Sequence, residues 1–196
     1  MLVLLFAACT PVAGTNAGDT RVWTSNWADH LVYQSVAVDT LGAGGSDTAA
    51  DPTARLDATL VATGAEWALS LRDADDAGLG DIVRELSFST DKGLAVTQVD
   101  GAVLDPAVVL LPATWDEGAA VVSGDYTATT DPLAAAVTWY GTFADVVTVR
   151  VSGPAGDPLA GLLRFAPDVG LVQFALGDTA GDLVWYDPAA TAAADE

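Results

Sequence analysis

LDATLVATGAEWALSLR, residues 56–72, is the stretch that decides the fold class of this 196-residue chain. Apolar side chains alternate with others on both sides of Thr63-Gly64: Leu56, Ala58, Leu60 and Ala62 before it, and Trp67, Leu69 and Leu71 after it. Alternation with a period of two is typical of a half-buried strand, and two such runs joined by a short turn form a hairpin. The stretch therefore predicts an antiparallel β-hairpin.

The same signals continue along the chain on both sides of this hairpin. Short runs rich in Val, Leu, Thr, Trp and Tyr are separated by Gly, Asp-Pro and Asp-Gly, which are turn signals. We expect strands over residues 30–39, 55–63, 66–72, 82–89, 94–99, 103–111, 119–127, 135–140, 145–152, 161–166, 171–176 and 183–186. Asp131-Pro132 could begin at most one helical turn. The predicted fold is a mainly β single domain, in which antiparallel strands form a curved sheet, half-barrel or sandwich with little or no helix.

The composition excludes several classes of function. The chain carries 7 Lys+Arg against 27 Asp+Glu, a formal net charge of −20, so its surface repels nucleic acid and anionic lipid headgroups. With 51% hydrophobic residues it can bury a core, which argues against disorder. One Cys and one His cannot build a Cys/His zinc site or a histidine cluster.

The first residues are typical of an export signal. Met1–Ala8 is an unbroken apolar run, too short to span a bilayer but of the length of a signal-peptide core. Phe6-Ala7-Ala8-Cys9 resembles a bacterial lipobox, although Phe6 replaces the usual Leu and no Lys or Arg precedes the run. Thr10, in place of an Asp, implies sorting to the outer membrane of a Gram-negative bacterium. The alternative is an ordinary buried thiol on a first strand.

These features predict the organisation of the chain. Residues 1–9 form a lipoprotein signal segment that ends at the acylated Cys9, and residues 10–21 a flexible tether rich in small, turn-forming residues. Residues 22–188 form the β domain, and residues 189–196 a disordered tail.

Segments of the C-terminal half carry a family resemblance, together with Trp27 and Leu31-Val32-Tyr33 upstream. They are Leu111-Pro112 with Trp115 and Gly118, YGTFADVV at residues 140–147, and LRFAPDVGLV at residues 163–172. They resemble bacterial lipoproteins of the TapB-like kind, in which Pro-Ala stands where this chain has Trp139-Tyr140 and Gly where it has Asp168. The resemblance implies an antiparallel sheet, curved like that of the LolA/LolB lipoprotein carriers, and transfers no catalytic residue.

The densest acidic cluster is a candidate calcium site. Asp73, Asp75, Asp76 and Asp81 surround Gly78, and a hard cation such as Ca²⁺ requires several converging oxygens. The spacing does not fit an EF-hand loop, because Arg84 stands at the twelfth position. A solvated acidic hairpin tip is the plainer interpretation.

The aromatic residues and the histidine offer a second candidate site. Six Trp residues could include a platform for stacking sugars, at positions 23, 27, 67, 115, 139 and 185. Trp67, Trp139 and Trp185 lie inside predicted strands, where a large ring usually fills the core, whereas Trp23 and Trp27 are candidates for exposure. His30 stands beside Asp29 with no nucleophile nearby in sequence, which favours a structural role over that of a general base.

The sequence as a whole predicts a lipid-anchored protein of the cell envelope with a non-catalytic β domain. If the sheet curves over an apolar cavity, the ligand is a lipid or another hydrophobic molecule. The alternative is a surface module that binds calcium or carbohydrate through the Asp73 loop and exposed Trp residues. An enzyme has the least support, because no nucleophile-elbow or phosphate-binding motif is present.

Overall fold

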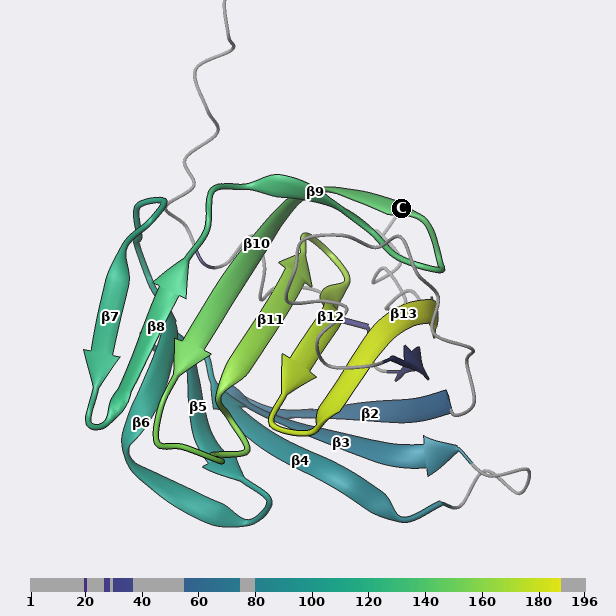
Figure 1. Cartoon of the computed structure of the whole chain (residues 1–196), viewed down its shortest axis with the longest axis horizontal. Coiled ribbons are helices and arrows are strands. Elements are labelled where there is room, and N and C mark those ends of the chain that lie inside the picture. The colour runs from purple at the N-terminus through teal and green to yellow at the C-terminus, as the bar shows by residue number, and fades with distance from the viewer. Residues whose placement is uncertain (1–19, 21–26, 29, 37–54, 75–79, 188–196) are drawn as a thin grey trace, which may run out of the picture.

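The computed structural model describes residues 20, 27–28, 30–36, 55–74 and 80–187 (Figure 1). These residues form thirteen strands and no helix. The strands are β1 His30–Ser35, β2 Arg55–Thr63, β3 Glu66–Ala74, β4 Ile82–Ser89, β5 Gly93–Val99, β6 Ala102–Pro112, β7 Ala120–Ser123, β8 Tyr126–Thr130, β9 Ala134–Val137, β10 Thr142–Ser152, β11 Gly161–Ala166, β12 Gly170–Leu176 and β13 Thr179–Asp187. The prediction of a mainly β domain with little helix is confirmed.

The strands form one antiparallel sheet that curls almost into a barrel. The hydrogen-bonded order is β6-β5-β4-β3-β2-β1-β13-β12-β11-β10-β8-β7, and β9 pairs with β10. Neighbours in space are therefore mostly neighbours in sequence, except where β1 pairs with β13 and joins the two ends of the meander. In Figure 1, β7, β8 and β10–β13 form the front of the molecule, and β2–β6 lie below and behind them.

The sheet has one seam that backbone pairing does not close, between β6 and β7. Cα atoms of the two strands still approach within 8 Å, and the Val109 amide donates to the Ser123 hydroxyl at 3.1 Å. Because paired strands lie about 4.8 Å apart, this space is too narrow to admit a further strand. At the end of β6, Thr20 donates its amide to Ala113 and its hydroxyl to Pro112, which fixes the point where the preceding residues join the domain.

The core fills the inside of the curled sheet. Trp27 lies at its centre, stacked on Phe165 with ring centroids 5.7 Å apart and edge-on to Phe88 at 5.6 Å. Gly170 has a φ of 97°, and a Cβ there would lie 2.9 Å from the Trp27 ring. The alternation predicted before Gly64 is confirmed for Leu56, Ala58 and Leu60, which are buried, whereas Ala62, next to the turn, is exposed. Val147, Val149 and Val151 of β10 are buried as well.

Turn chemistry explains where several strands end. The hairpin predicted at Thr63-Gly64 is present, with Thr63 paired to Glu66 and Gly64 at a φ of 66°. Asp100 and Gly101 both have positive φ, as an Asp-Gly hairpin turn requires. Asp168 has a φ of 59°. This left-handed conformation is one that Asp adopts more readily than most other non-glycine residues.

Two local predictions were wrong. The strand expected over residues 119–127 is the hairpin of β7 and β8, because Gly124 adopts a φ of 59° and turns the chain. No helical turn follows Asp131, and residues 134–137 form the strand β9. The strand expected over residues 135–140 ends at Val137, because Thr138 and Gly141 close a turn by mutual hydrogen bonds.

Candidate functional site

One small cavity in the interior is bounded by described residues. It measures about 10 Å³, space for about one water molecule. It lies beside the central aromatic cluster and is lined by Trp27, Leu31, Leu60, Leu69, Phe88, Val169 and Leu171. An acyl chain does not fit in this cavity.

The predicted lipidation and calcium residues are only partly covered by the structure. Cys9, Asp75 and Asp76 lie outside the described residues. Asp73 lies one residue before the end of β3, with its amide donating to the Asp81 carbonyl at 3.0 Å. Among the described residues no three His, Cys, Asp or Glu side chains are grouped as metal ligands, and the calcium site stays a prediction.

The structure reverses the expected exposure of the tryptophans. Trp27 is only 3% exposed, although the sequence favoured it for the surface. Trp139 and Trp185, expected in the core, are 50% and 45% exposed, because Trp139 lies in a turn and Trp185 faces outward from β13. Trp67 is partly buried and packs on the core, as predicted. Trp23 lies outside the described residues.

Trp139 stands at the tip of a hairpin that folds across the sheet. The hairpin, called the arm below, consists of residues 134–146: β9, the turn and the first part of β10 (Figure 1). It is held on the neighbouring strands by hydrogen bonds from its backbone. The Tyr140 amide donates to the Leu183 carbonyl at 2.8 Å, and the Trp139 amide donates to the Asp182 carboxylate.

A row of polar side chains on the outer face of the sheet lies beneath the arm. Arg164, Gln173 and Asp182 are cross-strand partners on β11, β12 and β13. The Arg164 guanidinium donates to Gln173 Oε1 at 2.7 Å. Gln173 Nε2 then donates to Asp182 Oδ1 at 3.0 Å and to the Val137 carbonyl of the arm at 2.8 Å. Gln173 therefore links the sheet to the arm.

Burial gives this polar row unusual electrostatics. Gln173 is fully buried, and Asp182 is 7% exposed. Desolvation raises the pKa of Asp182 to about 6, although hydrogen bonds from Gln173, Trp139 and Leu183 and the charge of Arg164 favour its ionised form. Desolvation also lowers the pKa of Arg164, with the nearby Arg150 acting in the same direction. The geometry indicates that the row fixes the arm in place.

Aromatic rings surround the point where the arm meets β13. Tyr140 stacks on Phe143 at 5.9 Å and contacts Tyr186 at 4.9 Å. On the outer face of β13, the Trp185 ring lies edge-on to His30 at 5.5 Å. His30 is exposed and packs against this ring. We call Trp139, Tyr140 and Trp185 the aromatic patch; Tyr140 is 47% exposed.

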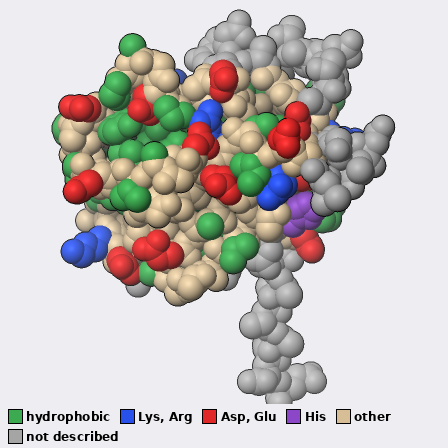
Figure 2. Space-filling view, turned by 90° about the horizontal axis from the view of Figure 1, so that it is seen from below, with side chains coloured by type: hydrophobic (Ala, Val, Ile, Leu, Met, Phe, Trp, Pro, Cys, Tyr) green, Lys and Arg blue, Asp and Glu red, His purple; other side chains and the backbone are tan. Residues whose placement is uncertain are grey.

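A second exposed apolar surface lies at the opposite side of the molecule. Figure 2 shows apolar side chains gathered on its left, the side of β6–β8 in Figure 1, with acidic side chains around them. Val103 of β6 and Val122 of β7 are 72% and 71% exposed.

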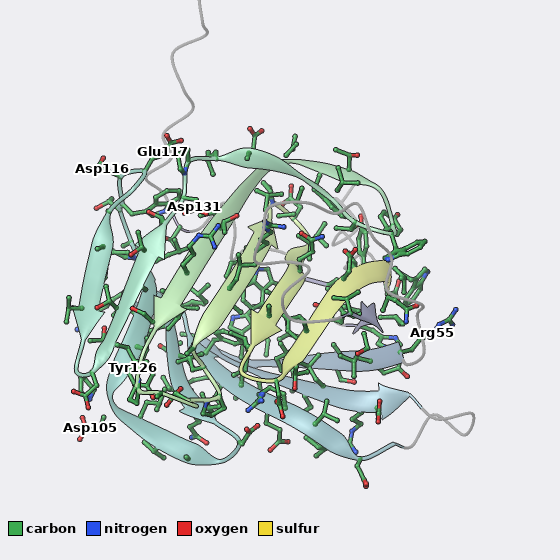
Figure 3. The ribbon with its side chains drawn as sticks, in the orientation of Figure 1. Arg55, Asp105, Asp116, Glu117, Tyr126 and Asp131 are labelled. Carbon is green, nitrogen blue, oxygen red and sulfur yellow. The ribbon has the colours of Figure 1, made fainter. Side chains whose placement is uncertain are left out.

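Acidic side chains near the end of β6 brace loops. Asp116, Glu117 and Asp131 lie together at the upper left of Figure 3. A Glu117 carboxylate oxygen accepts the Leu133 amide at 3.2 Å, and Asp131 forms an ion pair with Arg150 at 2.9 Å. These contacts hold the chain where it leaves β8 for the arm. Of the neighbours Asp116 and Glu117, only Glu117 is seen to brace a loop through its side chain among the described residues.

An inward-facing arginine closes the other end of the curled sheet. Arg84 of β4 is 6% exposed and pairs with Asp100 on the β5–β6 turn at 2.5 Å and with Asp178 on the β12–β13 turn at 3.3 Å. Its Nε has no hydrogen-bond partner among the described residues. Arg84 thus connects two distant turns across the end of the core.

Comparison of the chain with protein-family models, with curated proteins and with solved structures finds no match. None of the described residues forms a helix that is long and apolar enough to cross a membrane.

Sequence reasoning missed the polar row and the aromatic patch. Arg164, Gln173 and Asp182 are separated in sequence, and only the strand register brings them together. A signal for the patch was present, since Trp139-Tyr140 immediately precede Gly141, a residue type that favours turns. A tryptophan in a turn is more exposed than one in a central strand.

Proposed function

We propose that this chain is a lipid-anchored protein of the cell envelope whose β domain is a non-catalytic binding module. Support for the anchor comes from the apolar run before Cys9, from the lipobox-like Phe6-Ala7-Ala8-Cys9 and from the resemblance to TapB-like lipoproteins. Thr20, within the predicted tether, is hydrogen-bonded to the end of β6. Cys9 and Thr20 are eleven positions apart, so the tether reaches at most about 40 Å.

The observation that carries the binding role is a set of exposed aromatic rings at the arm and on β13, whereas the interior cavity bounded by described residues is small. The cavity of about 10 Å³ has no room for a lipid chain. Trp139, Tyr140 and Trp185, in contrast, leave about half of each side chain exposed on a segment held by hydrogen bonds. Exposed rings on a rigid support are typical of recognition surfaces.

The arrangement favours binding over catalysis. His30, the single histidine, packs its ring against Trp185 rather than against a hydroxyl or a thiol. Asp182, whose pKa is raised, is already engaged by Gln173 and by the Trp139 amide. Both groups therefore support the aromatic patch and do not form a nucleophile–base pair.

Replacement of the anchoring residue tests the first half of this proposal. The full chain, Cys9→Ser and Thr10→Asp are expressed in a Gram-negative host, and the membranes are separated by density. The parent chain is expected in the outer membrane and Cys9→Ser outside the membrane fractions. Thr10→Asp, which keeps the acylated Cys9, is the matched control and is expected in the inner membrane. Cys9→Ser that stays with the membranes would contradict the anchor.

A further inference from the structure

The arm presents its two tip rings in a fixed position. Within the turn, the Thr138 amide donates to the Gly141 carbonyl at 2.8 Å, and the Gly141 amide donates to the Thr138 hydroxyl at 3.2 Å. Bonds from the arm to Gln173, Asp182 and Leu183 hold the turn on the sheet. Because the backbone of the turn is already fixed, a ligand that stacks on Trp139 or Tyr140 does not have to order it, which reduces the entropic cost of binding.

Trp185 extends this surface along β13. Asp182, which accepts the Trp139 amide, and Trp185 both lie on the outer face of the strand, three positions apart in sequence. At the rise of an extended strand this separation is roughly 10 Å. A ligand that contacts both Trp139 and Trp185 must span about this distance, which suits an extended chain of several units better than one small molecule.

The chemistry around the aromatic patch restricts the ligand. A net charge of −20 repels anionic ligands, and the Arg164 guanidinium beneath the arm is engaged by Gln173. The rings are two indoles and a phenol, which combine a large apolar face with a polar edge. His30, Thr142 and Asp187 are exposed at the rim and offer hydrogen-bonding groups.

An uncharged sugar chain meets all of these conditions. The C–H groups on one face of a pyranose ring pack on the electron-rich face of an aromatic ring, and its hydroxyls point outward to rim groups. From these observations, and resting on the proposed function, we infer that the aromatic patch binds an uncharged pyranose oligosaccharide. Trp139, Tyr140 and Trp185 form the stacking platform, and Gln173 and Asp182 are positioning residues for the arm.

The test is a titration of the purified full chain in detergent with defined hexasaccharides. Cellohexaose, chitohexaose and maltohexaose are added while intrinsic tryptophan fluorescence and heat are measured. At least one of them is expected to bind with a Kd below about 1 mM. Trp139→Ala and Trp185→Ala are each expected to raise that Kd by about tenfold or more.

Matched variants separate loss of binding from loss of folding. Val122→Ala removes an exposed apolar side chain on β7, away from β13, and is expected to leave the Kd unchanged. Trp139→Phe and Trp185→Phe keep a stacking face and are expected to retain most of the affinity. Circular dichroism and the thermal midpoint check that each variant is folded.

The outcomes answer two separate questions: whether the ligand is a sugar, and whether the aromatic patch is the surface that binds it. If none of the hexasaccharides binds, the ligand class is wrong. Hexalysine is titrated in parallel, and if it binds and loses affinity in Trp139→Ala, the patch recognises a cationic peptide; the proposed surface then stands and the sugar inference falls. Sugar binding that both Trp→Ala variants leave intact would overturn the surface and the inference together.

Discussion

Two arginines lie on opposite faces of the same sheet, and their surroundings differ. Arg84 points into the end of the core, where its partners Asp100 and Asp178 sit on turns with side chains 44% and 94% exposed. Arg164 lies on the outer face and pairs with Gln173, which is fully buried and bonded to the arm. The first arginine closes the domain, whereas the second belongs to a row that holds an added segment on its surface.

This difference separates stability from function. The contacts of Arg84 connect turns around the core, so changing them affects the folding of the whole domain. The contacts of Arg164 and Gln173 lead to a hairpin that carries exposed rings, so changing them affects a surface. The variants below test this separation, from the largest expected effect to the smallest.

Arg84→Ala is expected to lower the free energy of unfolding by about 3 kcal/mol, because it leaves a cavity and removes the link between two turns. Urea unfolding followed by circular dichroism measures the change. Asp178→Asn is the control, and its exposed carboxylate is expected to contribute less than about 0.5 kcal/mol. The affinity of the aromatic patch is expected to stay unchanged in Arg84→Ala. A large loss of affinity in Arg84→Ala would contradict the proposal that Arg84 contributes to stability and not to binding.

Gln173→Leu is expected to cost about 2 kcal/mol, because it leaves the Val137 carbonyl and the Asp182 carboxylate without their amide partner. The arm loses its link to β12, so amide hydrogen exchange is expected to speed up most at Trp139 and Tyr140. Gln98→Leu, on β5 away from the arm, is the matched control. Unchanged exchange at the tip would show that Gln173 does not hold the arm.

Asp182→Asn is expected to change how stability depends on pH. Because the folded pKa of about 6 lies above the ordinary value of 3.8, the contribution of Asp182 is greatest below pH 4 and is lost as the pH rises through 6. Asn keeps an oxygen for Gln173 and Trp139 without the charge. At pH 7 the variant is expected to be more stable than the parent by about 1 to 2 kcal/mol, since solvent screens part of the cost.

The comparison at pH 4 provides the control for this variant, because both proteins are then uncharged at position 182. Their unfolding free energies are expected to converge there. A constant difference between pH 4 and pH 7 would contradict a desolvated carboxylate beneath the arm.

Trp185→Ala is expected to change the free energy of unfolding by less than about 0.5 kcal/mol, because its side chain faces outward and is 45% exposed. Trp27→Ala is the contrasting variant, because Trp27 contacts Phe88 and Phe165 in the core, and a loss of about 4 kcal/mol is expected. Thermal unfolding of the pair measures whether the outer tryptophan is free of a core role. Similar losses in both would contradict that assignment.

Local signals in the sequence were sufficient for the class of the fold. Three strands have the predicted bounds, Arg55–Thr63, Ile82–Ser89 and Gly161–Ala166. The pairing of β1 with β13, which closes the meander, joins residues about 150 positions apart and leaves no local signal. Alternation shows which face of a strand is buried, but it does not identify the neighbouring strand.

The candidate site was less predictable for the same reason. The apolar run before Gly141 has the composition of a strand, but the Thr138 hydroxyl bonds to the Gly141 amide and ends β9 early. That one local bond moves Trp139 from an expected core position to the surface. The Arg164–Gln173–Asp182 row depends on register across three strands, which includes a bulge between Arg164 and Phe165.

The most direct test of the account is a map of backbone amide shifts in the full chain, recorded by NMR as the tightest-binding hexasaccharide is added. The account predicts that shifts concentrate at residues 137–142 and 182–187, with the amides around the interior cavity unchanged. Shifts at Leu31, Leu60 and Leu69 without a change in the arm would place the ligand inside the barrel and contradict the central claim.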